Sequence, residues 1–233
     1  MNTKTIVCAG VVAAAFGLAG CGSEPTTEAT STSAATETAT STSAAAPPLT
    51  TAPPTPAAPA AGELTIADYL KSANITETPV RAGDPGAPKL EFPVPAQWEQ
   101  AIDVPGNPFW AVMMTTPADP ANPPVIEARL SKLSADVPIQ TIFDYAPGEI
   151  ENLPGYQSLG DGGRASLAGL EAFQMGGLYE ENGVRKLVAQ KTLLIASPTG
   201  PYLLRVRASG PEDDTQALIS ATAALDDNTV ITP

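Results

Sequence analysis

The stretch from residue 22 to about residue 62 limits where this chain can fold. It consists mainly of Thr, Ser, Ala and Pro, and Leu49 is its single large apolar residue. Such a segment cannot bury enough apolar surface to offset the conformational entropy that folding would remove. We therefore predict a disordered tether over residues 21–62, extended between Pro47 and Pro59 where prolines are dense, and a globular domain over residues 63–233.

A short apolar segment precedes the tether and ends at a cysteine. Lys4 is followed by an uncharged run from Ile6 to Ala19. A basic start, an apolar run too short to span a bilayer and small residues at a cut site are typical of a secretory signal. Leu18-Ala-Gly-Cys21 also resembles the lipobox of bacterial lipoproteins, in which the cysteine thiol receives a diacylglyceryl group.

This segment predicts where the protein resides. Residues 1–20 are expected to be a lipoprotein signal peptide, with Cys21 as the acylated first residue of the mature chain. The lipid would then hold the domain at the extracytoplasmic face of the cell membrane, within the cell envelope. An ordinary secretory peptide with a cysteine nearby is the alternative.

Charge and rare residue types exclude several functions. The net charge is −13, and loss of Lys4 with the signal brings it to −14. Nucleic acids and anionic lipid surfaces need basic patches, so we expect no nucleic-acid partner. The absence of histidine excludes Ser-His-Asp catalysis and imidazole zinc sites, and we expect no metal and no cofactor. Cys8 leaves with the signal and Cys21 is the anchor, so no cysteine is left for a disulfide.

Hydrophobic patterning predicts an α+β domain. Thr65-Ile-Ala-Asp68 is similar to a capping box, and Asn182-Gly183 is a hairpin signal between two strand-like runs. The expected elements are helices over 66–73, from Pro138 and over 212–225, and strands over 90–92, 109–116, 125–133, 165–179, 184–196 and 201–208. Strands that cluster between helices favour an antiparallel β-sheet with helices packed on it.

Several separate motifs carry a family resemblance. They are Thr65-Ile-Ala-Asp-Tyr69, Pro93-Val-Pro95 with Trp98, Thr116-Pro-Ala-Asp-Pro120, Ala146-Pro-Gly-Glu149, Val188-Ala-Gln-Lys-Thr192 and Thr229-Val-Ile-Thr-Pro233. With the lipobox and the tether, they resemble the LpqN-type lipoproteins of mycobacteria. The resemblance implies a PsbP-like α/β sandwich in an envelope protein that binds partners. It implies no catalytic residue, and only the lipid-bearing position transfers, to Cys21.

Three aromatic residues are the candidate binding residues. Trp98, Phe109 and Trp110 lie in or beside proline-rich segments, and tryptophans near loops are favoured at binding surfaces. Packing in the core is the alternative for each of them. We expect Trp110 to contribute most to binding and Trp98 to come second.

Polar residues give weaker candidates. Asp213-Asp214 and Asp226-Asp227 lack the spacing of a metal loop and are expected at the two ends of a helix. Asp161-Gly-Gly-Arg164 is expected to be a turn between strands, because it lacks the residues of a phosphate loop. Lys186 and Lys191 could act as bases, but they fall on opposite faces of one strand, so at least one of them should be solvated.

These observations favour a lipid-anchored binding protein without catalytic activity. It would act as an adaptor or carrier in envelope biogenesis or at the cell surface, and its ligand would be a protein or an apolar envelope lipid. The alternative is a carboxylate-dependent envelope hydrolase, which needs two acidic side chains facing each other across a cleft, as in glycosidases.

Overall fold

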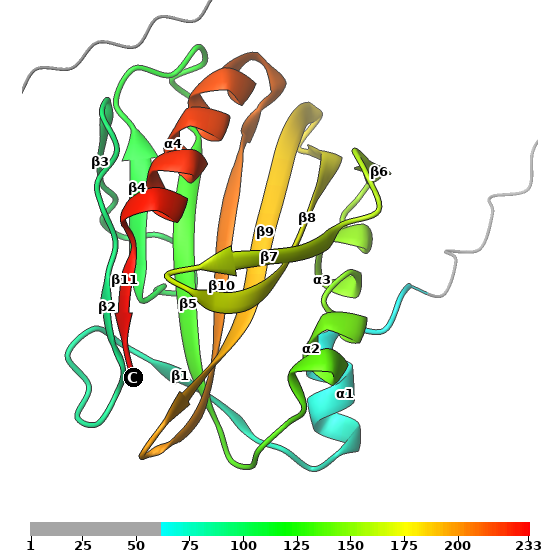
Figure 1. The fold of residues 1–233 in the computed structure, drawn as a ribbon. Helices are drawn as coiled ribbons and strands as arrows, with labels where there is room; N and C mark the ends of the chain where they lie inside the picture. The colour runs from blue at the N-terminus through cyan, green and yellow to red at the C-terminus, as the bar shows by residue number, and fades with distance from the viewer. Residues whose placement is uncertain (1–61) are drawn as a thin grey trace, which may run out of the picture. The chain divides into compact units, whose positions relative to one another are not determined.

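A computed structural model describes residues 62–233, and Cys21 and the tether lie outside this range. The described elements are α1 (Ile66–Ser72), β1 (Glu77–Val80), β2 (Lys89–Glu91), β3 (Trp98–Gln100), β4 (Trp110–Met114), β5 (Val125–Leu133), α2 (Ile139–Tyr145), α3 (Gly148–Glu151), β6 (Gln157–Ser158), β7 (Gly163–Leu167), β8 (Leu170–Glu181), β9 (Val184–Ser197), β10 (Gly200–Pro211), a 3-10 turn (Glu212–Asp214), α4 (Thr215–Asn228) and β11 (Val230–Thr232). Figure 1 shows their arrangement.

Within residues 62–233, nine strands form one antiparallel sheet, which confirms the predicted α+β class. The strand order is β3-β4-β5-β10-β9-β8-β6, with β1 paired to β5 and β7 paired to β8. Strands β7 to β10 follow one another as hairpins; the sequence predicted this meander for β8, β9 and β10, with β7 and β8 as one strand. β11 pairs with β2 in a separate two-stranded sheet.

Different helices cover the two faces of the sheet (Figure 1). α4 packs on one face, where Leu218 and Leu225 join the main core around Leu193 and Leu204. α1, α2 and α3 pack against the other face in two smaller clusters. None of the helices within residues 62–233 has the length and hydrophobicity that crossing a membrane requires.

The capping box at the start of α1 is confirmed. The backbone N–H of Asp68 donates to the Thr65 hydroxyl at 3.2 Å, and the Asp68 carboxylate accepts from the Thr65 backbone at 3.0 Å. The helix predicted from Pro138 is confirmed as α2, except that Pro138 is its N-cap and the first helical residue is Ile139; the short α3 follows it.

The run from Ala165 to Tyr179, predicted as one strand, is a hairpin. Leu167 pairs with Leu170, and Ala168 and Gly169 between them have φ angles of 51° and 78°. Two positive φ angles define the type I′ turn that joins tightly twisted strands. Alanine rarely adopts this conformation, so residue 168 could not be recognised as part of a turn from its type. The hairpin folds over the α4 side of the sheet, and its residue Leu167 is buried in that core.

The last helix also begins differently from the prediction. Residues 212–214 form a 3-10 turn, and α4 runs from Thr215 to Asn228, so the acidic residues precede the first turn of the helix. Asp214 is buried. Both oxygens of its carboxylate accept from the backbone N–H of Ala118, at 3.2 and 3.3 Å. This contact ties the 117–124 loop to the start of α4.

A largely buried ion cluster lies on the face opposite α4. The Arg205 guanidinium donates to Glu77 at 2.5 Å, and its Nε lies 3.1 Å from a Glu149 oxygen. Burial alone would raise the pKa of Glu77, but the hydrogen bond and the charge of Arg205 lower it below its ordinary value. The cluster joins β10 to β1 and α3, three segments that are far apart in the chain.

We expect Glu77→Gln to lower the free energy of unfolding by about 2 kcal/mol at pH 7, because it weakens a buried ion pair. Because folding lowers the pKa of Glu77, its stabilisation is present above the unfolded value of about 4.5 and is lost as pH falls through the folded value. Denaturant unfolding from pH 7 downwards should therefore show wild type and Glu77→Gln converging below that range.

Glu171→Gln is the matched control, because Glu171 pairs with Arg164 at an exposed site. That variant should change stability by less than about 1 kcal/mol. An equally large loss in both variants would contradict the role given to the buried cluster.

Candidate functional site

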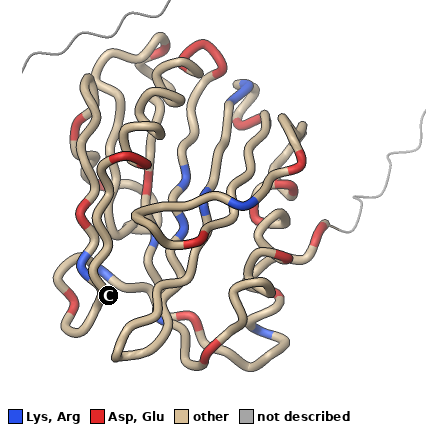
Figure 2. Tube along the Cα trace, viewed as in Figure 1, with Lys and Arg blue, Asp and Glu red and all other residues tan. Residues whose placement is uncertain are grey.

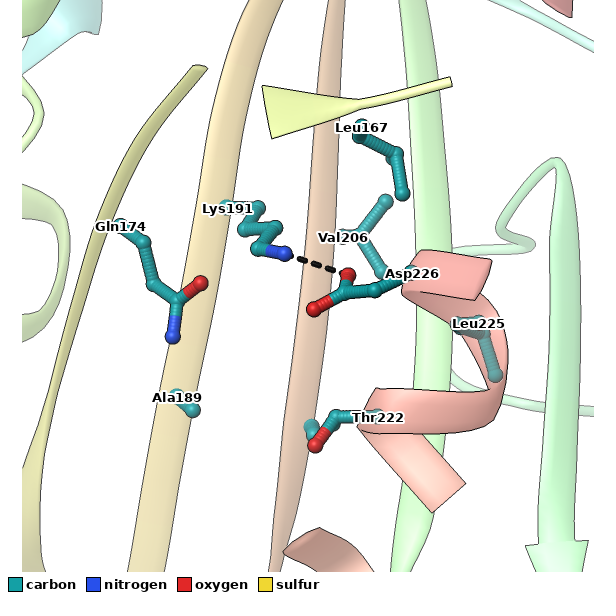
Figure 3. Close-up of a pocket in the computed structure, with 9 residues that line it drawn as sticks. Leu167, Gln174, Ala189, Lys191, Val206, Thr222, Leu225 and Asp226 are labelled. Carbon is teal, nitrogen blue, oxygen red and sulfur yellow. Dashed lines mark hydrogen bonds and ion pairs between the residues drawn. The ribbon is translucent and has the colours of Figure 1, made fainter. Parts of the chain in front are cut away.

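A groove crosses the α4 side of the sheet between α4 and the β7–β8 hairpin. Its enclosed end has a volume of about 60 Å³ and is lined by Leu167, Val206, Leu225 and the Lys191–Asp226 pair, among others (Figure 3). An open part of about 400 Å³ adjoins it below the 159–165 segment. Gln174 and Ala189 line both spaces, so the two are parts of one groove.

An ion pair closes the inner end of the groove. The Lys191 ammonium binds the Asp226 carboxylate and donates to the Ser166 carbonyl oxygen at 3.3 Å. These contacts connect β9 in the floor to α4 and to the β7 strand above (Figure 3). The Lys191 side chain is only 12% exposed.

The expectation that Lys186 or Lys191 is solvated is wrong. Lys186, on the opposite face of β9, is also mostly buried and pairs with Glu181 at 2.5 Å. Each lysine packs its aliphatic stem on the sheet and pairs its ammonium group with a carboxylate, Glu181 or Asp226. Alternation along the strand does not reveal such partners.

Small residues make the groove hollow. Gly176 on β8 and Ala189 on β9 are cross-strand partners in its floor, and Ala208 on β10 continues the row. A side chain at Gly176 could not be added without change, because its Cβ would lie 2.9 Å from the Val188 carbonyl oxygen. This row of the floor therefore offers a flat surface of backbone and methyl groups, between the longer side chains of Gln174 and Lys191.

Exposed apolar side chains lie at the groove and beside it. Leu159, before β7, lines the open part and is one of the exposed large hydrophobic residues of the domain. Ile219 of α4 is half exposed and lies one turn before Thr222, which lines the enclosed end. Of the predicted turn Asp161-Gly-Gly-Arg164, Asp161 and Gly162 lie in the β6–β7 connection, whereas Gly163 and Arg164 begin β7; Gly162 to Arg164 line the open part.

The structure separates the three predicted aromatic residues. Trp98 on β3 is 7% exposed and belongs to the main core beside α4. Trp110 on β4 is half-buried and stacks on Phe92 with ring centroids 4.8 Å apart. Phe109 and Trp110 line a surface groove of about 320 Å³ under the 82–90 loop. Core packing accounts for the position of Trp98, and the binding roles of all three stay predictions.

Within residues 62–233, the carboxylates of the ion cluster and those at the two ends of α4 are held by other protein groups. Glu77 and Glu149 both bind Arg205, and the pKa of Glu77 is lowered, whereas a general acid needs a raised pKa. Asp214 and Asp226 serve as a loop anchor and as the partner of Lys191. Figure 2 shows acidic residues distributed around the domain and fewer basic residues among them.

Sequence reasoning did not find this groove. Its floor consists of Gly and Ala positions that become neighbours only through strand register, and its roof is the hairpin that was predicted as a continuous strand. The only sequence signals were a lysine at position 191, an acidic pair at the end of the predicted last helix, and the glycines at 160, 162 and 163.

Trp98→Ala should lower the free energy of unfolding by about 3–5 kcal/mol, because it removes a large buried side chain. Trp110→Ala should cost less, because Trp110 is only half-buried. Thermal and denaturant melts of the two variants measure this difference. A Trp98→Ala protein as stable as wild type would show that Trp98 does not support the core.

Comparisons with known proteins place the domain in a family. The model of the family described as probable lipoprotein LpqN matches residues 62–232. The chain is 44% identical over 175 residues to Lipoprotein LpqN of Mycobacterium tuberculosis, which covers 75% of this chain and 77% of that protein. A crystal structure of LpqN, described as involved in cell envelope biogenesis of the same organism, aligns with a TM-score of 0.70 and 43% identity, covering 73% of this chain and 99% of that one. The motifs quoted from the sequence thus reflect true relatedness, and the chain belongs to the LpqN lipoprotein family.

Proposed function

We propose that this protein is a lipid-anchored binding protein of the cell envelope that carries an apolar ligand in the groove between α4 and the β7–β8 hairpin. The observation that carries the proposal is the open space of about 400 Å³ with a small-residue floor and an enclosed inner end. Binding sites for small apolar molecules are concave and apolar with few polar groups, and this groove fits that description.

The chemistry of the groove supports binding in preference to catalysis. Its lysine is neutralised by Asp226, and the chain has no histidine to act as a base near neutral pH. The remaining lining is apolar side chains, glycine and neutral polar groups, apart from Arg164 in the open part, which pairs with Glu171. Such a surface can hold an alkyl chain, and it supplies no unpaired group for proton transfer.

The proposed anchor agrees with the family. LpqN of M. tuberculosis is named a lipoprotein, and its structure is linked to envelope biogenesis. For this chain we propose acylation of Cys21 after removal of residues 1–20, with residues 21–62 as the spacer between membrane and domain. A carrier on a long spacer can reach ligands some distance from the membrane surface.

A protein-binding adaptor is the second candidate. The groove beside Phe109 and Trp110 favours it, because half-buried aromatic residues in a surface depression are typical anchors for a partner. Trp110→Ala should then weaken capture of a protein partner by about 2 kcal/mol or more while leaving the apolar groove unaffected.

Filling the floor of the groove tests the carrier function. In the full chain carrying Cys21→Ser, Ala189→Leu should weaken binding of dansyl-aminoundecanoic acid by about tenfold or more, because Ala189 lines both parts of the groove. Fluorescence titration measures the affinity, and thermal melts check that the variant is folded.

Ala196→Leu is the matched control, since Ala196 is an exposed position on the same strand. It should bind the probe as the parent does. Equal affinity in the Ala189→Leu and Ala196→Leu proteins, or a parent that binds no probe, would rule out the groove as the ligand site.

Replacement of the proposed anchor residue tests membrane attachment. Cys21→Ser should move the protein from the membrane to the soluble fraction, because the acidic domain has no other means of holding a bilayer. Membrane fractionation followed by immunoblotting gives the result. A Cys21→Ser protein that still sediments with membranes would contradict lipidation at this residue.

A further inference from the structure

Arg207 is a cation without a protein partner on the face of the sheet opposite the groove. Within residues 62–233 its side chain makes no ion pair, and its Nη2 atom is buried without a hydrogen bond. Its neighbours along β10, Val206 and Ala208, point to the α4 side and line the groove, so Arg207 points away from it.

Two carboxylates on this face are held by other arginines. Glu127 is the cross-strand partner of Arg207 on β5, but both of its oxygens accept from Arg129, at 2.9 and 2.8 Å. Glu149 lies 3.1 Å from Arg205 Nε. A buried guanidinium nitrogen without an acceptor is costly, and proteins normally pair such a group with an anion.

Donor groups lie beside Arg207 on the same face. Ser209 is two residues further along β10 and therefore points the same way. Burial and the charge of Glu181 raise the pKa of Tyr179, while the charges of Lys186 and Arg207 and hydrogen bonding to Ser209 act to lower it. Tyr179 therefore lies close to both cations and to the Ser209 hydroxyl.

We propose that Arg207 and Ser209 form a binding site for an oxyanion, a phosphate or carboxylate group of a small soluble ligand or of a lipid headgroup. A guanidinium offers several N–H donors in the fork geometry that suits such groups, and a serine hydroxyl adds another donor. The site lies on the opposite face from the groove, so it does not depend on the carrier function.

Calorimetry with inorganic phosphate tests the site at constant ionic strength, in the full chain carrying Cys21→Ser. The parent should bind phosphate saturably, and Arg207→Gln should bind it about 10- to 100-fold more weakly, as expected for the loss of hydrogen bonds to a charged group. Without phosphate, Arg207→Gln should melt at the same temperature as the parent or higher, because it removes a guanidinium nitrogen that is buried without a hydrogen bond.

Two further variants make the result specific. Arg185→Gln removes the same charge from an exposed pair with Glu212 and should bind phosphate as the parent does. Ser209→Ala keeps the arginine and should weaken binding several-fold, which gives an independent reading if Arg207→Gln folds poorly.

Comparing glycerol phosphate with a short-chain phosphatidylglycerol separates the two ligand sources. Equal affinities identify a soluble ligand, and tighter binding of the lipid that Arg207→Gln weakens identifies a headgroup, because binding of the acyl chains in the groove would not depend on Arg207. The proposal is overturned if the parent shows no saturable binding of phosphate or acetate, or if Arg207→Gln binds phosphate as tightly as Arg185→Gln.

Discussion

The central strands β8, β9 and β10 must bury both of their faces, and the rest of the domain follows from that requirement. Each is at least 12 residues long, so the meander exposes more apolar surface than one helix can cover. α4 covers part of one face, and the β7–β8 hairpin folds over another part. The groove is the area that α4 and the hairpin leave uncovered between them, where the residues of the sheet are small.

On the opposite face, part of the buried surface consists of paired charged side chains. Arg129 and Arg205 lie on it among apolar residues, and carboxylates from β1, β5 and α3 neutralise them. Such clusters fix the relative placement of segments more than they add stability. Here the cluster fixes β1 and α3 against the meander. Arg207, left outside this pairing, is the group through which the same face can meet a ligand.

Sequence patterns predicted the elements whose signals are local. The capping box at Thr65, the Asn182-Gly183 turn and the alternation in Val125–Leu133 all gave correct elements. Two kinds of element were not predicted, each for a physical reason. The β7–β8 turn was missed because Ala168 adopts a backbone conformation that glycine or asparagine normally occupies. The very short strands were missed because they depend on long-range pairing; these are β1, β3, β6 and β11. The groove also depends on long-range pairing, because Gly176, Ala189 and Ala208 become neighbours only in the folded sheet.

The claim that the groove is the ligand site can be tested most directly by mapping ligand contacts in solution. Backbone NMR spectra of the full chain carrying Cys21→Ser, titrated with dodecanoate, report every amide that senses the ligand. The account predicts saturable shifts at Gly176, Ala189, Lys191 and Thr222, and little change around Trp110. Shifts confined to the Phe109–Trp110 region, or none that saturate, would contradict it.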